Sequence, residues 1–89
     1  MYPTNFNQLK AYLVEGMQLK LIDTNLTNHK YLNVTRKIIK KQTNAIKFEG
    51  GSWLGLGSTG EKASNYTFNN NTFTYQDKYT KLVYQFIES

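Results

Sequence analysis

Hydrophobic residues near the start of the chain recur at the spacing of an α-helix. Phe6, Leu9 and Leu13 are separated by three and four residues, so they fall on one side of a helix. Gly16 follows them, and glycine is a residue at which helices commonly end. We therefore predict a helix over residues 5–15.

The hydrophobic period then changes to two, which is typical of a β-strand with one buried face. Leu19 and Leu21 alternate with polar residues and predict a strand over residues 17–22. In the last third of the chain the same alternation involves mainly aromatic residues. It predicts three further short strands, centred on residues 66–68, 73–75 and 82–86.

The segment 31–48 fits two patterns. Its many β-branched residues favour a pair of strands joined by a turn at residues 43–44. As a helix, the same segment would carry a loose apolar stripe that ends at a glycine pair. We choose the strand pair, 31–42 and 45–49, in which the isoleucines at 38–39 interrupt the alternation as a β-bulge would.

Glycine marks the next segment, because residues 50–60 hold five of the six glycines, and we expect a loop there. The length of 89 residues suits a single domain, residues 1–89. The helix and the strands together predict an α+β fold. In this fold the N-terminal helix packs on a small antiparallel β-sheet of about five strands.

Positive charge is concentrated in one part of the chain. The formal net charge is +5, from 11 basic and 6 acidic residues. No acidic residue lies between Asp23 and Glu49, although the rest of the chain is slightly acidic. The basic residues of this segment are Lys30, Arg36, Lys37, Lys40, Lys41 and Lys47. Such a segment favours an anionic partner, and a solvated lysine-rich surface is the alternative interpretation.

Residue types that carry chemistry are scarce. The chain has no cysteine, and its one histidine, His29, lies beside a lysine. Residues 55–60 match the pattern G-x-G-x-x-G, but we expect strands rather than a helix after it, and Glu61 stands where a phosphate-binding loop needs lysine. The carboxylates are scattered along the chain. We therefore expect no enzyme activity, no catalytic residues, no cofactor and no metal site.

Trp53 is the only tryptophan and lies within the glycine-rich stretch. It either folds back over the core, which is the more common place for a large aromatic ring, or contacts a partner. Together with the six basic residues, it completes the set of candidate contacts to a partner or a nucleic acid. Arg36 is the only arginine, so binding to a nucleic acid would depend mainly on its phosphate backbone.

The run RKIIKKQTNAI at residues 36–46 is followed by SWL at 52–54 and KAS at 62–64. This arrangement resembles small orphan proteins of phages and prophages of low-GC Gram-positive bacteria, over roughly the C-terminal two thirds of the chain. Residues 55–60 look like an insertion between the last two pieces. The resemblance implies a cytoplasmic accessory protein of a mobile element that binds either a nucleic acid or a host protein.

Charge, composition and resemblance together predict a non-enzymatic protein that acts by binding. We expect it to modulate or inhibit a host protein, such as a defence nuclease or a replication factor, through its basic face. The alternative is direct binding to nucleic-acid backbones. No apolar run is long enough to span a membrane and the first residues lack a secretory pattern, so we expect a cytoplasmic protein without membrane contact.

Overall fold

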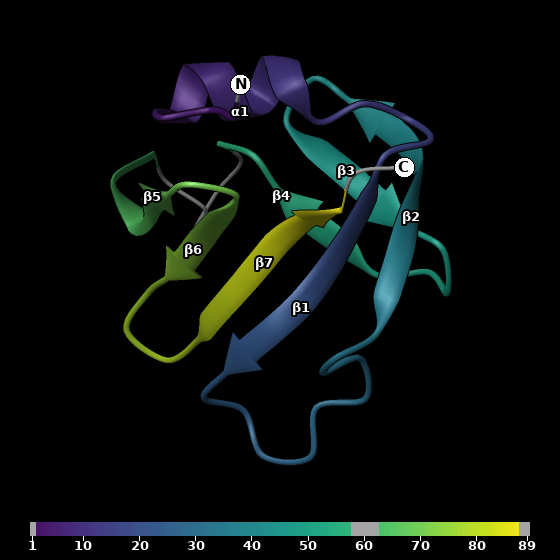
Figure 1. Ribbon diagram of the computed structural model, residues 1–89, viewed down its shortest axis with the longest axis vertical. Coiled ribbons are helices and arrows are strands. Elements are labelled where there is room, and N and C mark those ends of the chain that lie inside the picture. Colours follow the sequence, from purple (N-terminus) through teal and green to yellow (C-terminus); the bar gives the residue numbers. More distant parts are fainter. Residues whose placement is uncertain (1, 58–62, 88–89) are drawn as a thin grey trace.

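In the computed structural model, which describes residues 2–57 and 63–87, seven antiparallel strands form one sheet and a short α-helix lies against it (Figure 1). The elements in chain order are α1 (Phe6–Tyr12), β1 (Gln18–Thr24), β2 (Thr35–Gln42), β3 (Ala45–Phe48), β4 (Trp53–Gly55), the 3-10 turn η1 (Ala63–Asn65), β5 (Tyr66–Asn69), β6 (Thr72–Gln76) and β7 (Lys81–Ile87).

The predicted α+β fold, a helix packed on about five strands, is wrong, because the described protein is mostly sheet. The helix α1 has only seven residues and ends before Leu13, which is already extended. The chain leaves the helix early because it joins the sheet directly afterwards. Gly16 donates its amide to the carbonyl of Ile38, and Ile38 donates to the carbonyl of Met17, each at 2.8 Å.

The strand β4 is the second difference from the sequence-based expectation, since it lies in the glycine-rich stretch expected to be a loop. It pairs with β3 in a register that sets Leu54 opposite Ile46. Leu54 and Leu56 are both buried in the core. The two leucines alternate with Gly55 at the period of a strand, and their burial outweighs the low strand propensity of glycine.

The predicted strand pair of residues 31–48 is confirmed as β2 and β3, and the helical alternative is wrong. β2 begins later than predicted, at Thr35. The pairing register shifts between Ile38 and Lys40, so the predicted bulge is also confirmed. This shift decides which of the lysines on β2 point away from the core.

The strands predicted at residues 17–22, 66–68, 73–75 and 82–86 are confirmed as β1, β5, β6 and β7. The order across the sheet is β4-β3-β2-β1-β7-β6-β5, so the first and last strands of the chain lie at its centre. The sheet curls strongly. Its two outermost strands are joined by a hydrogen bond, which the hydroxyl of Tyr66 donates to the carbonyl of Gly55.

Aromatic rings fill the inside of the curl, and α1 closes one end of it. Tyr84 of β7 stacks on Phe48 of β3 and on Phe73 of β6, with ring centroids 5.6 and 5.4 Å apart. Leu9 of α1 is fully buried. Figure 1 shows α1 across the upper end of the sheet, whereas the loop between β1 and β2 lies at the lower end. At that lower end no helix of the described residues covers the curl.

Candidate functional site

The strand register separates the predicted basic residues and Trp53 by the face of the sheet on which they lie. Residues directly opposite one another on neighbouring strands share a face. On the outer face, away from the core, are Lys37, Lys40, Lys47 and Trp53. Arg36 and Lys41 lie on the inner side, while Lys30 belongs to the loop between β1 and β2.

Cross-strand pairing brings the outward residues together. Lys40 lies opposite Lys47, and Lys47 lies opposite Trp53. Lys20 of β1, opposite Thr35 of β2, lies on the same side of the sheet. Lys20 is outside the basic segment, so charge counting along the chain missed it. The alternation in β1 could have found it, but only with knowledge of which strands are neighbours. We call Lys20, Lys37, Lys40, Lys47 and Trp53 the outer lysine face.

Trp53 is 47% exposed, so the interpretation that it folds back over the core is wrong. The amine of Lys47 lies 5.7 Å from the centroid of its indole ring, within the range of a cation–π contact. Ile39, in the bulge of β2, is 46% exposed. The sheet therefore presents apolar and positively charged side chains side by side.

The lysines of the outer face have no acidic partners among the residues that the structure describes. The ion pair found among those residues joins the amine of Lys81 to the carboxylate of Asp23 at 3.7 Å, and neither residue belongs to the outer lysine face. The carboxylate of Glu49 accepts the backbone amide of Lys37 at 3.2 Å. Like charges directly opposite each other, as in Lys40 and Lys47, are destabilising. The positive charge of the outer lysine face therefore does not stabilise the fold.

Lys41 is engaged inside the protein. Its amine donates a hydrogen bond to the carbonyl of Lys10 at 2.5 Å. This carbonyl belongs to the last turn of α1, where the helix dipole favours a positive charge. Lys41 therefore supports the C-terminal end of α1 rather than the outer lysine face.

Arg36 is buried, with 5% of its surface exposed. Its guanidinium carbon lies 3.7 Å from the ring centroid of Tyr31 and 4.4 Å from that of Phe48. It also donates a hydrogen bond to the hydroxyl of Ser52. The turn before Ser52 depends on Gly50, which has a φ of +96° and approaches Tyr31 so closely that a Cβ would lie 2.8 Å from the phenolic oxygen.

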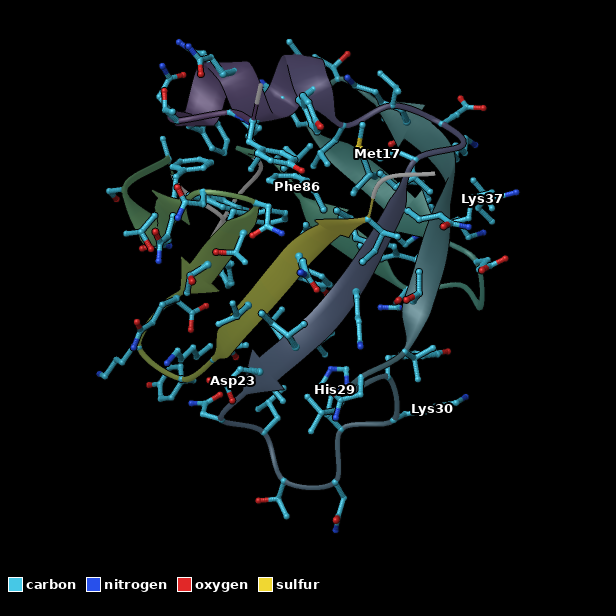
Figure 2. The ribbon with its side chains drawn as sticks, viewed as in Figure 1. Met17, Asp23, His29, Lys30, Lys37 and Phe86 are labelled. Atoms are coloured by element: carbon cyan, nitrogen blue, oxygen red, sulfur yellow. The ribbon has the colours of Figure 1, made fainter. Side chains whose placement is uncertain are left out.

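A pocket of about 380 Å³ opens beside Arg36 at the end of the curl away from α1. Its lining includes Trp53 of β4, Tyr84 of β7, and the loop residues His29 and Lys30, which are labelled at this end in Figure 2. We call it the Arg36 pocket. The Nδ1 atom of His29 accepts the amide of Tyr31 at 3.1 Å, so the proton of the neutral ring is on Nε2.

A larger hollow of about 790 Å³ lies between the end of α1 and the sheet. Met17, Lys37 and Phe86, labelled in Figure 2, contribute to its lining together with Glu15. One positive and one negative side chain leave it without a clear preference for a charged ligand. Of the two hollows, only the Arg36 pocket combines a buried charge with aromatic walls.

The predicted absence of a metal site concerns clusters of histidine, cysteine and carboxylates. Within residues 2–57 and 63–87, no three such side chains lie close enough together to hold a metal ion. Of the G-x-G-x-x-G stretch, residues 58–60 lie outside the described residues, as do Glu61 and the first residue of the KAS triplet. The described chain continues with η1 and strands.

None of the described helices has the length and hydrophobicity needed to cross a membrane. Comparison of the chain with protein-family models, with curated proteins and with solved structures gave no match. The function of the two candidate surfaces is therefore argued from their chemistry.

Proposed function

We propose that the chain is a non-enzymatic binding protein whose outer lysine face contacts an acidic surface of another protein. The observation that carries this proposal is the arrangement of Lys40, Lys47 and Trp53 in one row across three neighbouring strands. A regular sheet holds such a row rigidly, so little conformational entropy is lost when a partner binds.

The composition of the outer lysine face supports a protein partner. Exposed Trp53 and Ile39 can bury apolar area at the centre of an interface, and tryptophan is among the residues that contribute most to protein–protein affinity. The surrounding lysines complement an acidic surface and accelerate association. In the mobile-element context implied by the sequence resemblance, the partner would be a host protein, such as a defence nuclease or replication factor, which binding would modulate or inhibit.

Nucleic-acid binding is the second candidate, because the lysines of the outer face have no carboxylate partners in the described residues and Trp53 could stack on a base. The only arginine is buried in the Arg36 pocket, so it is not part of the outer lysine face and cannot read guanine from there. This binding would be weakly sequence-specific and would weaken steeply as salt increases.

The proposed function predicts that reversing one charge on the outer lysine face strongly weakens partner capture. Lys40→Glu changes an exposed lysine. We expect capture of the partner from a nuclease-treated Gram-positive host lysate to fall by about tenfold or more, because the new carboxylate repels the acidic surface of the partner. The matched control is Lys78→Glu, an equally simple change at an exposed lysine between β6 and β7. Quantitative mass spectrometry of the captured proteins measures both.

Equal capture by the wild type and by Lys40→Glu would contradict the role of the outer lysine face. Lys41 is not used in this test because its hydrogen bond to Lys10 ties it to the fold. A gel-shift titration across salt concentrations separates the second candidate. Failure to bind DNA or RNA at low salt would exclude direct nucleic-acid binding, whereas an affinity that falls steeply with salt would favour it.

A further inference from the structure

The Arg36 pocket contains a buried positive charge that has no acidic partner in the described chain. Arg36 is 5% exposed and lines the pocket. None of the residues that line the pocket is an aspartate or a glutamate. The ion pair found among the described residues joins Lys81 to Asp23 and does not involve Arg36.

The groups around Arg36 do not neutralise its charge. Ser52 accepts a hydrogen bond from the guanidinium, while Tyr31 and Phe48 contribute aromatic faces. Burial raises the pKa of Tyr84, and this outweighs the opposing effect of Arg36. Tyr84 is therefore a neutral phenol at physiological pH and supplies no negative charge.

Arginine is rarely buried without a counterion, because a charge that is removed from water loses its favourable hydration. Cation–π contacts with two rings offset part of this loss. The part of Arg36 that remains exposed borders an open pocket, which is a place from which an external anion could reach it. The planar guanidinium suits the two oxygens of a carboxylate or a phosphate.

The rest of the pocket narrows the chemistry of such an anion. Lys30 supplies a second positive charge, with its amine 5.3 Å from the ring centroid of Tyr31. Two positive charges match a doubly charged phosphate monoester better than a carboxylate. Trp53 provides an aromatic surface at the same pocket, against which a planar ring can pack. A volume of about 380 Å³ is within the usual range for small-molecule sites.

We propose that the Arg36 pocket binds a small aromatic phosphate monoester, with the phosphate at Arg36 and Lys30 and the ring against Trp53. Arg36 and Lys30 do not belong to the outer lysine face, whereas Trp53 borders both that face and the pocket. Nucleoside monophosphates and phosphotyrosine share this chemistry, so both are used as probes.

Trp53 is the only tryptophan of the chain and lines the pocket, so its fluorescence changes when a ligand binds there. Because Trp53 also borders the outer lysine face, the Lys30 variant described below distinguishes binding in the pocket from binding on that face. We expect phenyl phosphate to change this fluorescence in a saturable way, and phenol at the same concentrations to leave it unchanged. AMP and free phosphotyrosine then identify which source of the phosphate monoester fits better. Absence of a saturable change at millimolar phenyl phosphate would overturn the proposal.

Two variants at exposed lysines give a matched comparison. Lys30 and Lys78 both lie in loops, with their amines 5.3 and 5.5 Å from the ring of the following tyrosine. We expect Lys30→Ala to weaken phenyl phosphate binding about tenfold, as for the loss of a hydrogen bond to a charged group, and Lys78→Ala to have no effect. Equal affinities for all three proteins would place the ligand elsewhere and overturn the proposal.

Arg36→Lys tests the contact between Arg36 and the phosphate, because it keeps the positive charge and removes the planar guanidinium that can donate two parallel hydrogen bonds. We expect this single variant to bind phenyl phosphate about tenfold or more weakly than the wild type does. Circular dichroism checks that this variant is folded, and if it is not, the Lys30 comparison still decides. Unchanged affinity in folded Arg36→Lys would show that Arg36 does not contact the ligand.

Discussion

At the scale of single residues, Arg36 and Tyr84 belong both to the buried interior and to the lining of the Arg36 pocket. Tyr84 is 4% exposed, stacks on two aromatic rings and lines the pocket together with Arg36, whose positive charge favours the ionised phenol and so opposes the rise in the pKa of Tyr84 caused by burial. The sequence shows only that Arg36 is basic and lies among lysines. Its burial could not be predicted, because it depends on Tyr31, Phe48 and Ser52, which reach Arg36 from other parts of the chain.

Tyr84 predicts a specific dependence of stability on alkaline pH. Its pKa in the folded protein is raised above the ordinary value of 10.0, so the unfolded chain loses this proton first as the pH rises. The contribution of Tyr84 to stability is therefore fully present below about pH 10 and is lost as the pH rises through the folded pKa. Urea denaturation at pH 7 and at about pH 10.5 measures this loss.

The variant Tyr84→Phe keeps the ring and removes the hydroxyl. We expect it to lower the free energy of unfolding by about 1 kcal/mol at pH 7 and to show a smaller alkaline loss than the wild type. Tyr79→Phe is the control, because Tyr79 is 75% exposed and should behave like the wild type. The same alkaline loss in both variants would contradict the assignment to Tyr84.

At the scale of the elements, β2 shows how neighbouring residues of the same type acquire different roles. Its alternation and bulge were predictable from the β-branched residues and the isoleucine pair. The bulge sets Lys40 on the outer face and Lys41 beneath the end of α1. Charge counting treats these two lysines as equivalent, because it contains no information on the direction of each side chain.

This difference predicts opposite effects of two adjacent substitutions. Lys41→Gln removes the positive charge from the C-terminal end of α1 and should lower the free energy of unfolding by about 0.5–1 kcal/mol. Lys40→Gln relieves the repulsion with Lys47, so we expect a neutral or slightly stabilising effect of up to about 0.5 kcal/mol. Urea denaturation midpoints compare the two variants. Equal midpoints would contradict the structural role of Lys41.

At the scale of the whole molecule, α1 closes one end of the curled sheet and leaves the Arg36 pocket at the other. A helix of seven residues is not stable by itself in water, so α1 depends on its packing. Leu9 and Leu13 are fully buried, and Tyr12 packs edge-on against Phe86 with ring centroids 5.0 Å apart. The curl thus creates both the core and the pocket.

Truncating the buried face of α1 should therefore destabilise the whole protein. We expect Leu9→Ala to lower the free energy of unfolding by about 2–5 kcal/mol, through lost apolar burial and the cavity left behind. Val14→Ala, at a residue that is 45% exposed and follows the helix, should change it by less than about 0.5 kcal/mol. Urea denaturation followed by circular dichroism measures both, and equal effects would show that α1 does not contribute to the core.

The sequence by itself determined the alternation of most strands, the turn between β2 and β3, and the concentration of positive charge in residues 24–48. These properties are local, since they depend on residues a few positions apart. The tertiary structure decided the length of α1, the presence of β4, and the division of the basic residues between an outer face and a buried pocket. These depend on which distant strands pair and in which register, because a shift of one residue turns every side chain of a strand to the other face.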